Sequence, residues 1–299
     1  LMRSRPYEAQ DQRILVVGIT GTDVRDQPAK ERGEASLSDK TLALVVRKLE
    51  QFKPRAIGLD IYRENPVSAD YPDLAKTMEN SDRFFAICEI SEDDKNPGMP
   101  APPEVSLQRQ GFSDVLEDPD GVIRRQILAM APALPCLTDK SLNFRLASRY
   151  LADLGILPQL NTEKNFQFGN VVFKNLEENS GGYHGIDNLG HQILLNWRSS
   201  PQVAPQVTLK EVLNNELTLD LVRDRIVMIG TTGEIPHDYW FTPYSAQKMP
   251  YQKMSGIVIQ AHMVSQILSA VLDHRPLLSV LPKWCEVIWV WCWSMVGGI

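Results

Sequence analysis

The signatures of several common enzyme classes are missing from this chain of 299 residues. It has no GxSxG motif, no HExxH motif and no arrangement of Ser, His and Asp typical of a hydrolase. Its four cysteines form no CxxC pair, which argues against a zinc site. The net charge is −6 and no run of five or six like charges occurs, so nucleic acid is not expected as a partner.

Two stretches nearly repeat each other: RILVVGITG at residues 13–21 and RIVMIGTTG at residues 225–233, with five of nine positions identical. An apolar run that ends in a Gly/Thr turn often precedes a phosphate-binding loop. However, neither stretch contains GxGxxG or GxxxxGK[ST], and no helix is predicted directly after either loop. We therefore interpret them as two strands that occupy similar positions in one sheet, with carboxyl ends that open toward the same crevice.

Strands and helices alternate at both ends of the chain, and antiparallel pieces lie between them. Strands are predicted at residues 14–19, 56–62, 83–90, 121–130, 192–197 and 225–230, with a hairpin at 166–173. Helices are predicted at residues 39–52, 71–81, 141–154, 209–214 and 256–272. This pattern predicts an α/β domain over residues 1–275, with a mixed, largely parallel sheet covered by helices and an antiparallel hairpin insertion.

The two ends of the chain look like parts of something longer. No signal peptide is visible at the start of the given sequence, which we expect to continue from a preceding segment. Residues 284–299 contain one charged residue, Glu286, and four tryptophans, which favour membrane interfaces. Sixteen helical residues span roughly 24 Å, short of the roughly 30 Å hydrocarbon core. We expect residues 276–299 to be the truncated start of a transmembrane helix; the alternative is a buried C-terminal core helix.

Cys88 lies in a predicted strand, where a buried, unreactive thiol is the usual case. A disulfide between Cys88 and Cys136 is the alternative in an oxidising compartment. The sequence leaves the choice open because it does not show whether the two residues are close.

Three carboxylates lie near predicted strand ends: Asp23, Asp60 and Asp238. In open α/β sheets, ligands bind outside the carboxyl ends of the strands. If these strands are neighbours, the three side chains converge on one crevice and could hold a cation or a small polar ligand. The alternative is that each carboxylate forms only local turn or cap hydrogen bonds.

Two arginines and two histidines are further candidates for a functional site, and each also has a purely structural explanation. Arg124 and Arg125 are adjacent on a predicted strand, so they should face opposite ways and form either an anion site or a salt bridge. His237 next to Asp238 resembles a catalytic pair, but sequence neighbours seldom orient each other. His262 fits the apolar pattern of its helix and is predicted to be a core residue. No catalytic residue is therefore predicted.

Six segments occur in a recognisable order: RILVVGIT, LALVVRKLEQFKPRAIGLDI, DPDGVIRR, ILLNWRSS, DRIVMIGTTGEIPHDYWFTP and GIVIQAHMVSQIL, followed by the Trp-rich end. Together they resemble the type-two CHASE domain, a sensory extracellular domain associated with bacterial cyclases and histidine kinases. The resemblance covers nearly all of residues 1–275 and implies a sensor without catalysis. It also implies a place outside the cytoplasmic membrane, between transmembrane helices that lead to an effector domain.

The sequence departs from the family in one helix. The family often has a His just before the Ala of the helix that begins at Gly256, but here that residue is Gln260, and His262 follows two places later. A metal role is therefore not carried over, and whether a metal binds stays open.

Our first interpretation is an extracytoplasmic ligand-sensing module of a bacterial membrane-bound signalling protein, without a cofactor. Its ligand is an unidentified small molecule, and its predicted pocket residues are Asp23, Asp60, Arg124, Thr231, Thr232 and Asp238. Two alternatives remain open. One is a ligand-free structural or dimerisation module, active as a homodimer, and the other is a soluble α/β enzyme that uses a nucleotide phosphate.

Overall fold

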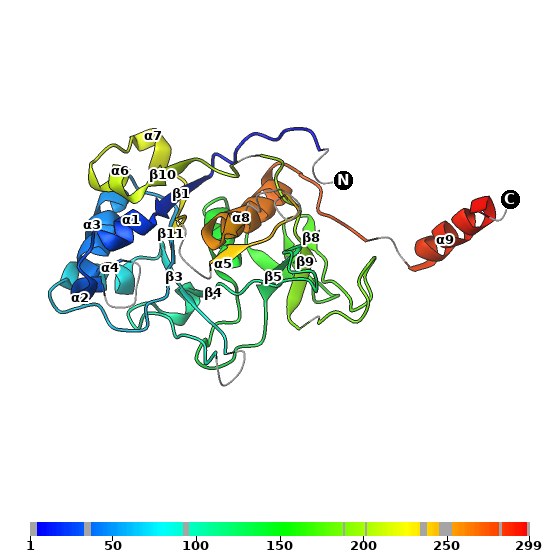
Figure 1. Cartoon of the computed structure of the whole chain (residues 1–299), viewed down its shortest axis with the longest axis horizontal. Helices are drawn as coiled ribbons and strands as arrows, with labels where there is room; N and C mark the ends of the chain where they lie inside the picture. Colours follow the sequence, from blue (N-terminus) through cyan, green and yellow to red (C-terminus); the bar gives the residue numbers. More distant parts are fainter. Residues whose placement is uncertain are drawn as a thin grey trace.

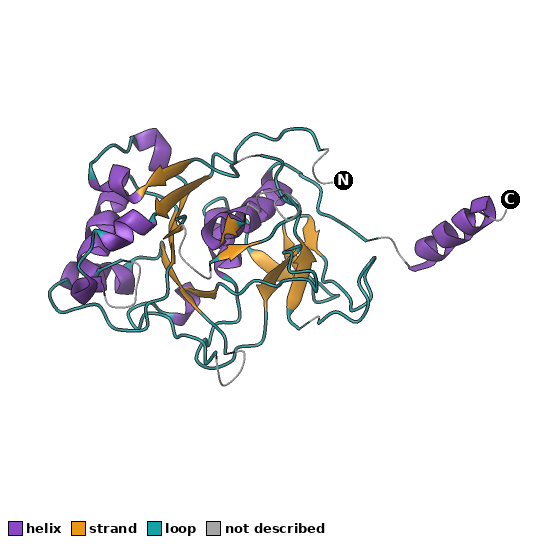
Figure 2. Cartoon of the chain, viewed as in Figure 1, coloured by secondary structure: helices purple, strands orange, loops and turns teal. Residues whose placement is uncertain are grey.

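A parallel sheet of six strands forms the centre of the molecule (Figures 1 and 2). The computed structural model describes residues 5–32, 37–91, 96–187, 189–200, 202–233, 238–244, 253–280 and 283–297. Within these ranges the strand order is β10-β1-β11-β2-β3-β4, and every pair in this sheet is parallel. The strands are β1 (Ile14–Ile19), β2 (Ala56–Asp60), β3 (Phe84–Cys88), β4 (Gln110–Phe112), β10 (Gln206–Thr208) and β11 (Ile226–Thr231).

Helices cover both faces of this sheet, which explains why its strands are continuous apolar runs. On one face lie α3 (Asp39–Glu50), α4 (Pro72–Asn80) and α6 (Leu209–Leu213). On the other lie α5 (Leu142–Ala152) and α8 (Gly256–Leu272). Within β1, Ile14 and Val16 pack toward α5 and α8, whereas Leu15 and Val17 pack toward α3. The predicted α/β class and the covered, largely parallel sheet are thus confirmed.

The antiparallel strands form three small sheets of their own instead of joining the central sheet. They are β5 (Arg125–Ala129) with β9 (His191–Leu194), β6 (Pro158–Leu160) with β7 (Phe166–Phe168) and β8 (Val171–Phe173), and β12 (Tyr239–Trp240) with β13 (Met254–Ser255). The predicted hairpin is β7–β8. Helix α8 is also covered on the side that faces away from the central sheet. There Ile123 and Trp197, which lie next to the β5–β9 pair, pack against two α8 residues, Ile259 and Met263.

Several short elements were not predicted, and one of them corrects an expectation. They are α1 (Gly21–Arg25), α2 (Ala29–Arg32), α7 (Leu219–Val222), the 3₁₀ helix η2 (Leu107–Arg109), and the strands β4, β6, β10, β12 and β13. A helix does begin directly after β1, contrary to expectation. Thr20 and Asp23 form a capping box that starts α1, since each side chain accepts a hydrogen bond from the other residue's backbone N–H. Five residues are too few to show a helical apolar period.

The two similar stretches are neighbouring strands in the same register. Ile14 of β1 lies opposite Ile226 of β11, and Gly18 lies opposite Gly230. Both glycines face close neighbours: a Cβ at Gly18 would lie 2.4 Å from Oγ1 of Thr232, and a Cβ at Gly230 would lie 2.8 Å from Cβ of Ile257. Gly18 and Gly230 therefore reflect tight packing at one level of the sheet.

We expect Gly230→Ala to lower the free energy of unfolding by about 1–3 kcal/mol, because the added methyl group overpacks the contact between β11 and α8. Gly182→Ala is the control, since a Cβ there would meet no atom within 4 Å. Urea denaturation monitored by circular dichroism measures both. Equal midpoints for the two variants would contradict the role given to this glycine.

The C-terminal helix α9 (Lys283–Gly297) extends away from the rest of the chain in Figure 1. Its apolar side chains are exposed, with Trp289 and Trp291 each 60% accessible. The alternative of a buried core helix is therefore wrong. None of the helices in the described ranges combines the length and the apolar character that crossing a membrane requires.

Candidate functional site

A cavity of about 420 Å³ lies at the carboxyl ends of β2 and β3, against the first turn of α8. Its walls include Asp60 at the end of β2, Tyr62 and Glu89 shortly after β2 and β3, and Gln260 of α8. This is the edge of a parallel sheet at which α/β proteins bind ligands. Larger hollows of about 510 and 630 Å³ are lined mainly by residues 163–181, the second also by residues 193–194, 266 and 277–280, and they lie away from this edge. The cavity is therefore the better candidate.

Asp60 is the last residue of β2 and lies opposite Gly230 of β11, which has no side chain to cover it. The carboxylate of Asp60 accepts no hydrogen bond from any residue in the described ranges. Burial, together with the negative charge of Asp238, raises the pKa of Asp60 to about 8. Such a shift marks a carboxylate that the described residues do not compensate.

Asp238 is held at the N-terminus of α8. Its carboxylate accepts a hydrogen bond of 2.8 Å from Oγ1 of Thr231, and its backbone carbonyl accepts one of 3.1 Å from the N–H of Gly256. A Cβ at Gly256 would lie 2.1 Å from Oδ1 of Asp238, so only glycine leaves room for the carboxylate there. Burial raises the pKa of Asp238, although these hydrogen bonds oppose the shift.

The opposite wall is a chain of hydrogen bonds that reaches α5. The hydroxyl groups of Tyr62 and Ser113 lie 2.8 Å apart. Nε2 of Gln260 donates to the carbonyl of Ser113 at 3.0 Å, and Oε1 of Gln260 accepts from Nδ2 of Asn143 at 2.8 Å. Burial and nearby carboxylates, Glu89 among them, raise the pKa of Tyr62. These bonds fix the side chains that face the cavity.

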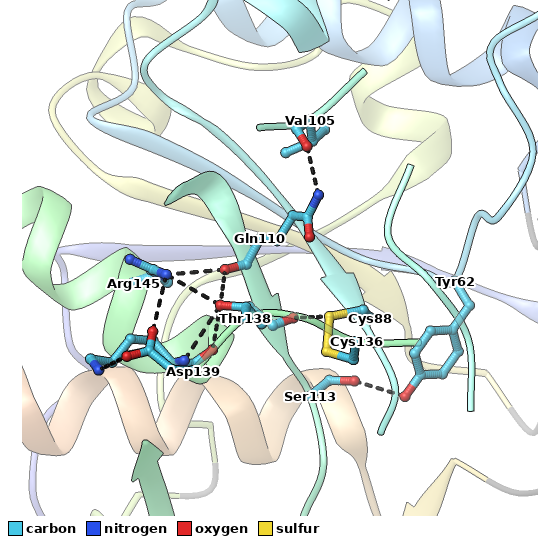
Figure 3. The surroundings of a disulfide bond; sticks show 11 residues. Tyr62, Cys88, Val105, Gln110, Ser113, Cys136, Thr138, Asp139 and Arg145 are labelled. Carbon is cyan, nitrogen blue, oxygen red and sulfur yellow. Dashed lines mark hydrogen bonds and ion pairs between the residues drawn. A yellow bond between two sulfur atoms is a disulfide. The ribbon is translucent and has the colours of Figure 1, made fainter. Parts of the chain in front are cut away.

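A disulfide between Cys88 and Cys136 lies beside this wall (Figure 3). The two Cα atoms are 5.3 Å apart and both side chains are fully buried. The disulfide ties the end of β3 to the segment before α5, where Oγ1 of Thr138 donates to the carbonyl of Gln110 at 2.9 Å. The question that the sequence left open is thus answered in favour of the disulfide, and the expectation of a free thiol is wrong.

The other residues predicted for the pocket at this edge of the sheet make contacts that support the fold. Thr231 is buried and supports Asp238 through its hydroxyl group. Thr232 packs against Gly18, and its carbonyl accepts a hydrogen bond of 2.7 Å from the hydroxyl of Tyr239. Asp23 caps α1 and is not part of the cavity wall. The structure therefore brings Asp60 and Asp238 together at the cavity, with Thr231 behind them.

Arg124 lies away from the cavity. It pairs with Asp118 at 2.9 Å and with Asp120 at 2.7 Å, on a separate hollow of about 410 Å³. Arg125 is buried and binds the other carboxylate oxygen of Asp118 at 2.9 Å. The salt-bridge alternative is confirmed, and the two arginines have the different exposures that strand alternation predicts.

Of the two candidate histidines, the structure describes only His262. His262 is buried in α8, with its ring centroid 4.9 Å from that of Trp197, and burial lowers its pKa to about 3. It is the core residue that the sequence predicts. His237 lies outside the described residues.

Within the described residues, no group of three or more His, Cys, Asp or Glu side chains is placed to hold a metal ion.

Tyr62, Gln260 and Trp240 are among the cavity residues that the sequence reasoning missed, although two of these three carry a signal. Tyr62 follows Asp60 by two positions in the strand predicted at residues 56–62, where alternate side chains face the same way. Gln260 follows Gly256 by four positions and so lies one helical turn from the cavity edge. Trp240 gives no such signal, because its position depends on the pairing of β12 with β13.

We expect the free energy of unfolding to fall as the pH rises from about 4 to about 8, through the contribution of Asp60. The raised pKa means that the native state binds more protons than the unfolded state within this window, so stability is lost as the pH passes the native pKa. Asp60→Asn should flatten this fall and be more stable than the unchanged protein at pH 9.

Urea denaturation at pH 5 and pH 9 measures this effect. Glu64→Gln is the control, because it removes an exposed carboxylate outside the cavity wall. Its free energy of unfolding should depend on pH as that of the unchanged protein does. A pH dependence that is the same with Asn or Asp at position 60 would show that this carboxyl group titrates normally.

Comparisons with known proteins give one match. The model of the family described as the CHASE2 domain matches residues 1–299, the whole chain. Neither the curated proteins nor the solved structures that were compared include a match.

Proposed function

Since this chain belongs to the CHASE2 family of sensory extracellular domains of signalling proteins, we propose that it detects a small molecule in the cavity beside Asp60 and Asp238. The proposal places the chain on the extracytoplasmic side of a bacterial membrane, as one part of a signal-transduction protein. The observation that carries it is the position of the cavity, between the strand ends and the first turn of α8.

Helix α8 supplies a route from the cavity to the C-terminal end of the chain. It runs for 17 residues from Gly256 to Leu272 and is buried along most of its length. Because packed interiors shift between discrete arrangements, a ligand that favours one position of the first turn also favours one position of the last. The ligand acts by its different affinity for the two arrangements.

The disulfide supports the extracytoplasmic part of the proposal. Disulfides form and persist in oxidising environments such as the periplasm and the cell exterior, and they are rare in the cytosol. The Cys88–Cys136 bond is buried next to the cavity wall, so it contributes to the structure of the proposed sensor itself.

We also propose that α9 inserts into a lipid bilayer. Its exposed side chains include four tryptophans and several aliphatic residues, an unusual surface for contact with water. Tryptophan is enriched at membrane interfaces. With vesicles, Trp fluorescence should shift to the blue and be quenched by brominated lipid. A chain ending at residue 280 should show neither change, and equal quenching of both chains would contradict the proposal.

A screen of small molecules by thermal shift tests the sensing function. A ligand should raise the melting temperature of the unchanged protein by several degrees and that of Asp238→Asn by much less. Glu64→Gln, which lies outside the cavity wall, should respond fully. If no compound raises the melting temperature, or if hits stabilise Asp60→Asn and Asp238→Asn as much as the unchanged protein, the proposed site is wrong. A stable dimer without any ligand would then favour the dimerisation module.

A further inference from the structure

The charged side chains that line the cavity are all acidic. They are Asp60 at the end of β2, Glu89 after β3, Asp114 after β4, and Asp238 directly before β12. No Lys, Arg or His of the described residues lines it. The four carboxylates come from four separate segments of the chain, so their convergence is a property of the fold and not of one acidic loop.

Nothing positive in the described surroundings offsets the charges of the two best-defined groups. The pKa of Asp60 is raised by burial and then by Asp238, with no opposing contribution from a cation. The pKa of Asp238 is raised by burial and opposed only by hydrogen bonds. Burial of a carboxylate without a positive partner is unfavourable, and a bound cation would remove that cost. Asp60 in addition lines the cavity without a hydrogen-bond donor from any described residue.

An anionic ligand is the first alternative, because helix N-termini attract anions. Here, however, the first turn of α8 already faces the carboxylate of Asp238, which packs against Gly256. A second anion would have to share that position and would meet Asp60 as well. The geometry therefore disfavours a negatively charged ligand.

A bare metal ion is the second alternative. The described residues contain no group of three or more acidic, His or Cys side chains placed to coordinate one. The cavity is also larger than an ion needs, at about 420 Å³. Its wall includes the rings of Tyr62 and Trp240 and the aliphatic side chain of Ile87. Aromatic rings attract organic cations through their faces, and apolar walls accommodate a carbon skeleton.

We infer that the ligand of this cavity is a small organic ammonium ion, with its charged nitrogen beside Asp60 and Asp238 and its carbon skeleton against Tyr62 and Trp240. The inference rests on the proposed sensing function and adds the chemical class of the ligand. The N–H groups of the ammonium would supply Asp60 with the donors that the described residues do not.

Titration calorimetry on the chain at low ionic strength tests this inference with ethanolamine as the probe. Ethylene glycol, glycolate and CaCl₂ are the neutral, anionic and metal comparisons. We expect ethanolamine to bind at least tenfold more tightly than any of them, and Asp60→Asn and Asp238→Asn each to weaken it at least tenfold. Glu64→Gln should stay within twofold of the unchanged protein. Circular dichroism of each variant establishes that it is folded.

The pH dependence provides a second readout. Because Asp60 holds a proton near neutral pH, binding of an ammonium ion should release it. The affinity should therefore rise about tenfold from pH 6 to pH 7, and the heat of binding should depend on the buffer. The other titratable groups that face the site, Tyr62, Glu89, Asp114 and Asp238, are unchanged in Asp60→Asn, which should lose this dependence.

The outcomes separate the two proposals. If a neutral or anionic compound binds, and both Asp60→Asn and Asp238→Asn weaken it, the sensing function stands and the cationic class is wrong. Tighter binding of Ca²⁺ than of ethanolamine at these residues would likewise overturn the class. Ethanolamine binding that neither variant changes places the cation elsewhere and refutes the inference. If none of the four probes binds, the inference is refuted, and the thermal-shift screen alone decides the sensing function.

Discussion

Asp11→Asn is expected to lower the free energy of unfolding by about 3–5 kcal/mol, because it leaves two partly buried arginines without the carboxylate that they share. Asp11 is buried and binds Nε of Arg13 at 2.7 Å. Its second oxygen accepts a hydrogen bond of 2.8 Å from Ser265 and lies 3.5 Å from Arg198. The carboxylate of Asp11 thus links three parts of the chain: the segment before β1, the segment after β9, and α8.

The pH dependence of this contribution follows from the pKa of Asp11. Burial raises the pKa, but the hydrogen bonds and charge of Arg13, with the hydrogen bond from Ser265, lower it overall. A carboxyl group with a lowered native pKa stabilises the fold above its unfolded value, near 4, and this stability is lost as the pH falls through the native value. The difference between Asp11→Asn and the unchanged protein should therefore shrink in acid.

Asp273→Asn is the matched control, because Asp273 binds the same Arg13 at 2.7 Å but has a side chain that is 53% exposed. Exposed ion pairs contribute about 0–1 kcal/mol. Guanidinium denaturation at pH 7 measures both variants. If Asp11→Asn shifts the midpoint no more than Asp273→Asn, the buried pairing is not the main contribution of Asp11.

Removal of the disulfide by the double change Cys88→Ala and Cys136→Ala is expected to lower the free energy of unfolding by about 4 kcal/mol. The two cysteines are separated by 48 positions, and closing a loop of that length restricts the unfolded chain strongly. Because the bond adjoins the segments that carry Glu89 and Ser113, its loss should also weaken ligand binding in the cavity.

Denaturation of the double variant and of the reduced, unchanged protein measures the effect. The control is the double change Cys285→Ala and Cys292→Ala, since these cysteines form no disulfide in α9 and their loss should leave the midpoint unchanged. An unchanged midpoint after loss of Cys88 and Cys136 would show that the native contacts alone hold these segments together.

Elements with a strong local pattern could be predicted from the sequence. Helix α8 has the predicted bounds, and β1 and β11 are continuous apolar runs. Strands of three residues, such as β4 and β10, carry too little pattern to be recognised. The capping box of α1 is present in the sequence as Thr20 and Asp23, but a helix of five residues has no apolar period to accompany it.

The candidate site was predicted only in part, because it depends on strand order. Asp60 and Asp238 converge because β11 lies between β1 and β2, and no local pattern specifies that order. Arg124 was predicted to belong to the same pocket. It lies directly before β5, which pairs with β9 in a separate sheet, and its side chain lines another hollow. The pairing of Cys88 with Cys136 is equally non-local.

The position of β11 also affects how the chain can fold. Strands β1 and β2 are close in sequence but do not pair, because β11 lies between them and comes more than 160 residues after β2. While the chain is being synthesised from its N-terminus, the inner edges of both strands stay without partners until residues 226–231 have appeared. Pairings across such distances form slowly. An exported chain that crosses the membrane unfolded would therefore complete its central sheet only after nearly the whole domain has emerged on the far side.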